Sequence, residues 1–223
     1  MLYTTDTLIS PELVEILETK KSIEDALFAR REQRQAHLTS IYSLIWWEAR
    51  KRPELNDKFE EYFISKEILN SIKTEAETRF LKPGTTSEML YFEFSFMMGD
   101  QACYSHTDKA GFVSASHRII IPLDPGLEFI MGDPGNEESV MLNPYQMYSF
   151  DGGKPHSARN HADYKTYYLF FDLLTPLIWE NLSDDEKLLL REMVRGNIKD
   201  PDKMAKLRET EFNQNVRPVI VEK

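Results

Sequence analysis

The sequence is poor in three features that mark other classes of protein. It has one cysteine, Cys103, so no disulfide can form within the chain, and we expect a reducing, cytoplasmic location. Lysine and arginine number 27 against 37 aspartate and glutamate, which gives a formal net charge of −10. Because binding to phosphate groups favours a basic surface, no nucleic-acid partner is expected.

Long apolar segments are the third missing feature. No apolar run approaches the ~20 residues that a membrane-spanning helix needs, so no membrane partner is expected. The first residues, Met1 to Asp6, lack the basic and apolar regions of a secretory signal. Of the 223 residues, 41% are hydrophobic and 12% aromatic, which is enough for a sizeable packed core in a single domain.

Both ends of the chain have helical patterns. Residues 1–82 carry apolar side chains at helical spacing, for example Leu13 and Leu17, and residues 175–223 contain further helices and a tail. Helix start signals and apolar spacing predict helices that begin after Pro11 and span 183–195 and 201–212. Helices of this kind cover one face of a sheet or form a homodimer interface, and the sequence leaves both roles open.

Residues 83–174 have short β-branched and aromatic runs between turns rich in Gly, Pro, Asn and Asp. Alternation with a period of two is clearest from Met89 to Met98. The runs expected to be strands are 89–98, 117–123, 127–131, 138–142, 146–150 and 164–173. Such short strands predict an antiparallel sandwich or barrel, a class that includes double-sheet jelly rolls.

Two histidines and an aspartate in this core have the pattern of a metal site. His106 and Asp108 are two residues apart, so on an extended strand both side chains point to the same side. His156 would come from a second strand. Two imidazoles and one carboxylate bind one face of a non-heme Fe(II) and leave the opposite face open for a cosubstrate and O2. A surface turn at His106 and Asp108 is the simpler alternative, and His117 and His161 could lie near the metal or face water.

The motifs around these residues resemble those of a known family. They are His106-Thr-Asp, Arg118-Ile-Ile-Ile-Pro-Leu, Phe150-Asp-Gly-Gly-Lys-Pro-His-Ser-Ala-Arg-Asn and Tyr167-Tyr-Leu-Phe-Phe-Asp. Over residues 89–174 the chain is similar to the aspartyl/asparaginyl β-hydroxylase superfamily and to the bacterial free L-proline cis-hydroxylases, which are Fe(II)/2-oxoglutarate-dependent dioxygenases. The resemblance implies a mainly β fold, with a double-stranded β-helix (a cupin-like jelly roll) as the core and helices at the N- and C-terminal ends.

The resemblance also implies roles for five residues. His106, Asp108 and His156 would be the iron ligands of the catalytic centre. Lys165 would bind a carboxylate of 2-oxoglutarate, at a position where the family usually has arginine. Arg118 would bind a second carboxylate, from the cosubstrate or the substrate.

Plainer roles stay open for some of these residues. Lys165 could be a solvated lysine at a strand end, and Arg118 could pair with Asp124 or Glu128 at the surface. Cys103 could bind metal as a thiolate, but a small buried hydrophobic side chain is the more common role.

The function that the resemblance implies is hydroxylation of an amino acid, free and proline-like, or of another small carboxylated metabolite, with release of succinate and CO2. Fe(II), 2-oxoglutarate as cosubstrate and O2 would be required. Three other functions stay open. They are hydroxylation of Asp, Asn or another residue within a peptide or protein, a cupin-like metal protein that does not use 2-oxoglutarate, and a catalytically silent binding module.

Overall fold

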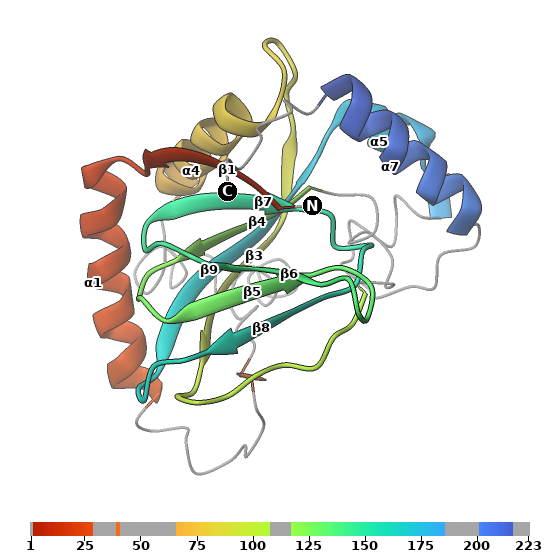
Figure 1. The fold of residues 1–223 in the computed structure, drawn as a ribbon. Coiled ribbons are helices and arrows are strands. Elements are labelled where there is room, and N and C mark those ends of the chain that lie inside the picture. The colour runs from red at the N-terminus through yellow and green to blue at the C-terminus, as the bar shows by residue number, and fades with distance from the viewer. Residues whose placement is uncertain (1, 29–38, 41–65, 108–116, 186–200, 216–223) are drawn as a thin grey trace.

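The computed structural model describes residues 2–28, 39–40, 66–107, 117–185 and 201–215. The strands form two antiparallel sheets (Figure 1). In spatial order, the larger sheet contains β1 (Leu2–Leu8), β7 (Gln146–Phe150), β4 (His117–Pro122), β9 (Thr166–Leu174), β3 (Glu88–Met97) and β2 (Thr39–Ser40). The smaller sheet contains β6 (Glu138–Met141), β5 (Leu127–Met131) and β8 (His156–Asn160).

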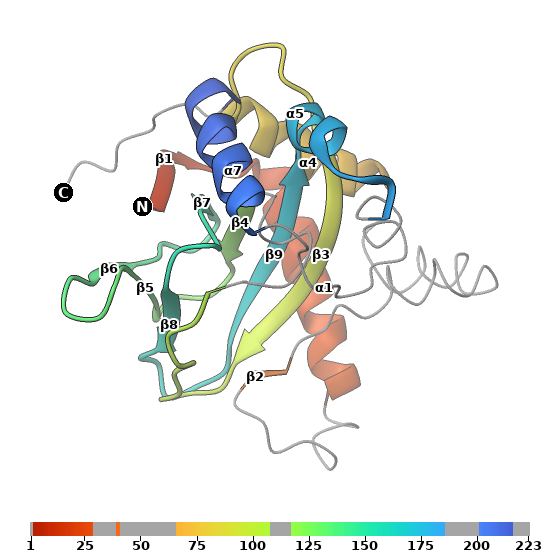
Figure 2. The ribbon, with the colours of Figure 1, turned by 90° about the vertical axis from the view of Figure 1, so that its right-hand side faces the viewer.

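The chain passes back and forth between the two sheets. From β4 onward, β4, β7 and β9 lie in the larger sheet, whereas β5, β6 and β8 lie in the smaller one. Figure 2 shows the smaller sheet as a separate layer beside the larger one. This arrangement confirms the predicted fold class, a mainly β jelly-roll core with N- and C-terminal helices.

Turn residues set the strand ends, which is why several observed strand bounds agree with those predicted from the sequence. β5 and β7 span the residues predicted for them. β5 follows Gly126 and is followed by Gly132, with φ of 101° and 127°, in the left-handed region that favours glycine. These two turns fix where the strand begins and ends.

Alternation along β4 separates two environments. Ile119 and Ile121 belong to the apolar cluster on the outer face of the larger sheet, whereas Ile120 belongs to the cluster between the sheets. Successive side chains of a strand point to opposite faces, so Arg118 shares the inner face with Ile120, and His117 lies on the outer face. The inner cluster also contains Phe129 of the smaller sheet.

Helices cover the outer face. α1 (Pro11–Phe28) contributes Leu13 and Leu17, and α4 (Lys66–Phe80) contributes Ile72 and Phe80, all buried against the larger sheet. Burial of each large apolar side chain is worth roughly 1.5–3 kcal/mol relative to exposure. These helices therefore have the sheet-covering role, and a homodimer through the N-terminal helices stays a prediction.

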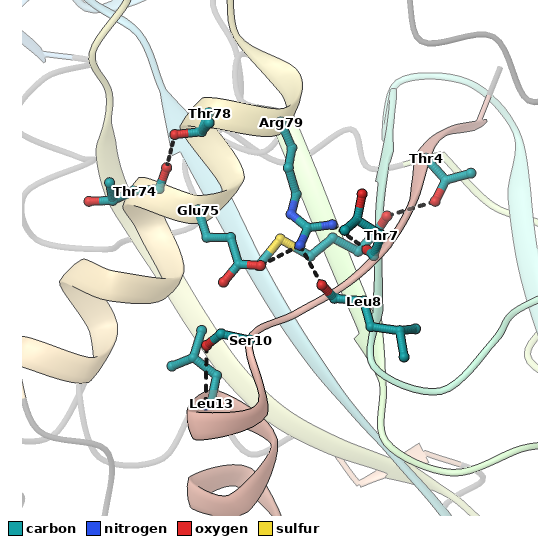
Figure 3. A network of polar contacts seen from close by, with 10 residues as sticks. Thr4, Thr7, Leu8, Ser10, Leu13, Thr74, Glu75, Thr78 and Arg79 are labelled. Atoms are coloured by element: carbon teal, nitrogen blue, oxygen red, sulfur yellow. Dashed lines mark hydrogen bonds and ion pairs between the residues drawn. The ribbon is translucent and has the colours of Figure 1, made fainter.

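The prediction that residues 1–82 are helical is wrong at the start of the chain, because residues 2–8 form the edge strand β1. The Thr4 hydroxyl donates a hydrogen bond to the Met147 carbonyl, 2.9 Å away, in the neighbouring strand. From α4, Arg79 donates to the carbonyls of Thr7 and Leu8, the latter at 2.7 Å (Figure 3). These long-range bonds stabilise an extended conformation that local periodicity does not reveal.

The C-terminal part contains α5 (Pro176–Asn181) and α7 (Pro201–Asn215), and α7 begins where the helix predicted over 201–212 begins. The helix predicted over 183–195 lies mostly outside the described residues. None of the described helices is both long and apolar enough to cross a bilayer.

Candidate metal and carboxylate site

His106 and His156 lie directly opposite one another on adjacent strand segments. The backbone N–H of His106 donates to the His156 carbonyl at 2.9 Å, and the N–H of His156 donates to the His106 carbonyl at 2.8 Å. Opposed residues of an antiparallel pair point their side chains to the same face. The two imidazole centroids are accordingly only 4.5 Å apart.

Both imidazoles are oriented in the same way. Nδ1 of His106 lies 2.9 Å from the Tyr104 carbonyl oxygen, and Nδ1 of His156 lies 2.9 Å from that of Lys154, in each case two residues earlier. A carbonyl oxygen only accepts, so Nδ1 is the donor and the neutral ring carries its lone pair on Nε2. Metal-binding histidines are commonly oriented by such a bond.

The two rings differ in their surroundings. His156 is buried, at 5% exposure, and its ring centroid lies 5.8 Å from that of Phe129 and 5.1 Å from that of Phe150. His106 is exposed, and the ring of Tyr104 lies 5.8 Å from it. The two imidazoles therefore lie at the boundary between an aromatic interior and solvent. A ligand can approach from the side of His106, and the aromatic rings around His156 exclude water on the other side.

Asp108, the third predicted ligand, lies outside the described residues. Among the described residues, no group of three His, Cys, Asp or Glu side chains is placed to hold a metal ion. The structure thus brings two predicted ligands together, and the role of Asp108 stays a prediction.

Arg118 is buried on the inner face and forms an ion pair with Asp172. Its Nε donates to Oδ1 at 2.9 Å and its Nη2 donates to Oδ2 at 3.1 Å. The guanidinium carbon lies 4.2 Å from the ring centroid of Phe170. The proposed surface pairing of Arg118 with Asp124 or Glu128 is wrong, because its carboxylate partner is Asp172.

One aromatic ring connects this ion pair with the histidines. Arg118 is the cross-strand partner of Phe150, and the ring of Phe150 lies 5.1 Å from that of His156. Phe150 also lies 6.0 Å from Phe170, the ring under the guanidinium. The imidazole pair and the buried cation therefore belong to one continuous interior.

Lys165 lies on the other face of the larger sheet. Its Nζ is 5.0 Å from the ring centroids of both Phe96 and Tyr167. Both rings belong to the outer apolar cluster that the helices cover. The structure therefore does not bring Lys165 to the histidine pair, and its proposed contact with 2-oxoglutarate stays a prediction.

The other two histidines that the structure describes, His117 and His161, have carboxylate partners. His117 Nε2 lies 2.9 Å from Glu211 Oε1, and both side chains are buried. His161 Nε2 lies 2.7 Å from Glu128 Oε2, and this hydrogen bond is the largest cause of the lowered pKa of Glu128. The Sγ of Cys103 accepts a hydrogen bond from the Ala158 backbone N–H at 3.0 Å.

Sequence reasoning missed the role of Asp172, Phe129 and Phe150 around the site. One signal was present for Asp172: it is a charged residue at an inner-face position near the end of the apolar strand β9. The aromatic residues gave no distinguishing signal, because phenylalanine in a strand is ordinarily part of the core.

Comparison with known proteins shows the fold. No protein-family model matches the chain, and no curated protein matches it. A prolyl hydroxylase from Trichoplax adhaerens, solved in complex with a hypoxia inducible factor peptide fragment, is similar with a TM-score of 0.50 and 9% identity over 82% of this chain and 87% of that chain.

Two further solved structures are similar over a smaller part of this chain. A 2OG-Fe(II) oxygenase family protein from Burkholderia pseudomallei has a TM-score of 0.35 and 12% identity over 41% of this chain and 46% of that chain. A cupin domain from Bordetella pertussis has a TM-score of 0.31 and 12% identity over 41% of this chain and 95% of that chain. The aligned part thus spans less than half of the Burkholderia protein.

Proposed function

We propose that the chain is an Fe(II)- and 2-oxoglutarate-dependent dioxygenase that hydroxylates an amino acid or another small carboxylated metabolite. The observation that carries this proposal is the matched pair His106 and His156, with centroids 4.5 Å apart and both Nδ1 atoms bonded to carbonyls. The fold shared with the Trichoplax adhaerens prolyl hydroxylase supports it.

The donor set fits a ferrous ion. His106 and His156 would bind it through Nε2, and Asp108 would supply the carboxylate, which together make the two-histidine, one-carboxylate set of non-heme iron oxygenases. When bound, Fe(II) with 2-oxoglutarate and O2 would supply the oxidising chemistry that hydroxylates a substrate and releases succinate and CO2.

The chain's own residues would orient the ligands and exclude water. The carbonyls of Tyr104 and Lys154 hold the two imidazoles in one tautomer. The rings of Phe129 and Phe150 pack around His156 and keep that side of the site dry. A dry interior strengthens the attraction between a buried cation and a carboxylate ligand.

Arg118 is the residue that we propose for the far carboxylate of 2-oxoglutarate. It lies on the inner face, one aromatic ring from His156, whereas Lys165 packs against rings of the outer cluster. A guanidinium also binds a carboxylate through two parallel N–H bonds, which an ammonium cannot do. Arg118 would then bind the carboxylate that, in the family, is bound by an arginine at the position of Lys165.

Anaerobic titration of Fe(II) and 2-oxoglutarate tests the proposal. The bidentate complex of a 2-oxo acid with Fe(II) gives a weak visible charge-transfer band, which should appear in the wild type and disappear in His106→Ala and His156→Ala. His161→Ala is the matched control, since that exposed imidazole pairs with Glu128 and should leave the band unchanged.

The outcomes separate the alternatives. Iron binding that needs both histidines without any 2-oxoglutarate band would favour a cupin-like metal protein. Absence of iron binding would favour a binding module. An unchanged band in His156→Ala would refute the site itself.

The substrate is tested separately. Succinate release should be stimulated by a free amino acid, with L-proline the first to try, more than by short peptides. Stimulation by Asp- or Asn-containing peptides alone would favour a peptide or protein hydroxylase. A cytoplasmic location and a homodimer through the N-terminal helices remain further proposals.

A further inference from the structure

Tyr104 is the most exposed large apolar side chain that the structure describes. Its exposed fraction is 82%, and the next most exposed side chain of this kind, Leu8, is at 54%. A tyrosine offers roughly 150–250 Å² of surface that packing could bury, and here most of it lies in water. A single exposed apolar residue is common on protein surfaces, so the surroundings of this ring decide whether it has a role.

The ring of Tyr104 lies beside one of the two proposed iron ligands. The segment that contains Tyr104 pairs with β8, where His106 lies opposite His156 (Figure 1). The ring centroids of Tyr104 and His106 are 5.8 Å apart, with the two planes at 62°. Because both residues are exposed, the tyrosine ring lies on the side from which solvent reaches the histidine pair.

Aromatic rings follow one another from solvent to interior at this site. Tyr104 contacts His106, and the centroid of His106 lies 4.5 Å from that of buried His156. Phe129 and Phe150 then surround His156, with centroids 5.8 and 5.1 Å away. A small ligand that enters from solvent and stops at the histidine pair would therefore have its outer part beside Tyr104.

The main chain and the side chain of Tyr104 can be tested separately. The carbonyl oxygen of Tyr104 accepts the hydrogen bond from Nδ1 of His106, at 2.9 Å. Any amino acid at this position supplies the same carbonyl, so this bond does not require an aromatic ring. A substitution of the side chain therefore leaves the orientation of His106 through this bond in place.

We propose, building on the function proposed above, that the ring of Tyr104 binds the apolar side chain of the amino-acid substrate. Tyr104 would thus be a residue that determines specificity for apolar over polar amino acids. Covering one face of the ring, roughly 80 Å², at ~25 cal/mol per Å² strengthens binding by about 30-fold. A cation–π contact between an exposed ring and an ammonium group contributes only about 2- to 5-fold, so the apolar contact dominates.

Tyr104→Ala tests the ring, and Tyr104→Phe keeps the ring but removes its hydroxyl. Calorimetric titration of the full chain with Fe(II) and 2-oxoglutarate, without O2, measures amino-acid binding in the absence of turnover. The probes are L-proline, L-leucine and L-isoleucine, compared with L-serine and L-aspartate.

The wild type should bind at least one of the three apolar probes more tightly than either polar probe. Ordering the ring offsets part of the 30-fold gain, so Tyr104→Ala should raise the Kd of that apolar probe about tenfold. Tyr104→Phe should leave this Kd within about threefold of the wild type, because it keeps the apolar surface. With O2 present, succinate release by Tyr104→Ala should show a higher KM for the same amino acid and little change in kcat.

Tyr164→Ala is the matched control. Tyr164 is also an exposed tyrosine, at 48%, and it follows the end of β8 that lies far from His156. Its carbonyl oxygen likewise accepts a hydrogen bond, from Nδ2 of Asn160 at 2.8 Å, and the substitution keeps that carbonyl. Tyr164→Ala should therefore leave the Kd of every probe unchanged.

Three results would overturn the proposal. They are an unchanged Kd for the apolar probe in Tyr104→Ala, an equal loss of affinity for apolar and polar probes, and no preference of the wild type for any apolar probe. Tyr104→Gln, which replaces the ring by a polar chain, is the second variant and should lose affinity for the apolar probe in the same way. Far-UV circular dichroism shows whether each variant is folded.

The charge-transfer band measured on the same samples separates this test from that of the proposed function. Tyr104→Ala should keep the band of Fe(II) with 2-oxoglutarate, because both histidines are intact. A band in the wild type, with amino-acid binding that does not depend on Tyr104, would refute the role of Tyr104 only. Absence of the band, with binding of an apolar amino acid that does depend on Tyr104, would refute the oxygenase only.

Discussion

Replacing Glu211 with alanine should loosen α7 from the larger sheet. Glu211 Oε1 lies 2.9 Å from Nε2 of His117 on β4, and the side chains are 2% and 1% exposed, respectively. Its other oxygen accepts a hydrogen bond from Asn215 Nδ2 at 2.7 Å. The carboxylate is therefore the polar centre of the contact between the C-terminal helix and β4.

The expected cost follows from burial. In Glu211→Ala the imidazole of His117 loses its partner inside the protein. A buried polar group left unsatisfied costs ~1–3 kcal/mol, and breaking a buried ion pair costs ~3–5 kcal/mol. We expect a loss of about 2–4 kcal/mol, which for a chain of this size lowers the Tm by roughly 5–15 °C.

The same contact predicts a pH dependence. Burial alone would raise the pKa of Glu211, but the hydrogen bond and charge of His117, together with the hydrogen bond from Asn215, outweigh burial and lower the pKa. A carboxyl group whose pKa is lower in the folded chain stabilises it above the unfolded value, about 4.3, and this contribution disappears as the pH falls through the folded value. The difference in the free energy of unfolding between the wild type and Glu211→Gln should therefore be largest near neutral pH and become smaller below about pH 4.

Thermal unfolding followed by circular dichroism measures the global effect, and hydrogen exchange of residues 201–215 measures the local one. Glu209→Ala is the control, because Glu209 is exposed on the same helix and should change the free energy of unfolding by less than about 0.5 kcal/mol. If Glu211→Ala is as stable as Glu209→Ala, and α7 is equally protected, the reasoning is refuted.

Two further predictions concern the framework. Arg79→Met removes the bonds to the carbonyls of Thr7 and Leu8, so it should lower the free energy of unfolding by ~1–3 kcal/mol. Hydrogen exchange should become faster in β1 but not in β5. If exchange in β1 is the same as in the wild type, the proposed stabilisation of β1 by Arg79 is contradicted. Gly132→Ala should cost ~1–3 kcal/mol in urea unfolding, because φ is 127° and the added Cβ would lie 2.6 Å from the Asn136 carbonyl oxygen. Gly84→Ala, where an added Cβ meets nothing within 4 Å, should lower the free energy of unfolding by less than Gly132→Ala does. Equal losses in the two variants would contradict the steric clash at Gly132.

The strands of the jelly roll could be predicted because their signals are local. β5 and β7 are short apolar runs whose ends are set by turn residues, and both have the predicted bounds. Gly126 precedes β5 and Gly132 follows it, and the left-handed backbone at each glycine ends the extended conformation. Because glycine in a turn is a local signal, the sequence alone indicates both ends of this strand.

Features that depend on distant partners could not be predicted. β1 is a strand because it pairs with β7, and Arg79 holds its end, yet both partners are far along the chain. The ion pair between Arg118 and Asp172 also depends on the pairing of β4 with β9, which no local pattern specifies. The alternative in which Arg118 pairs at the surface with Asp124 or Glu128, which are near it in sequence, is therefore wrong, because the partner comes from β9.

The face on which a residue lies decides which basic side chain can serve the interior. Lys165 precedes β9 and shares its side with Tyr167, whose ring belongs to the outer cluster, whereas Asp172 lies on the opposite side of the same strand. The register then sets Arg118 beside Asp172 and Phe150 on the inner face. Alternation along β9 thus excludes Lys165 from the inner face and favours Arg118 on β4, because strand geometry, rather than sequence distance, determines which charges share a face.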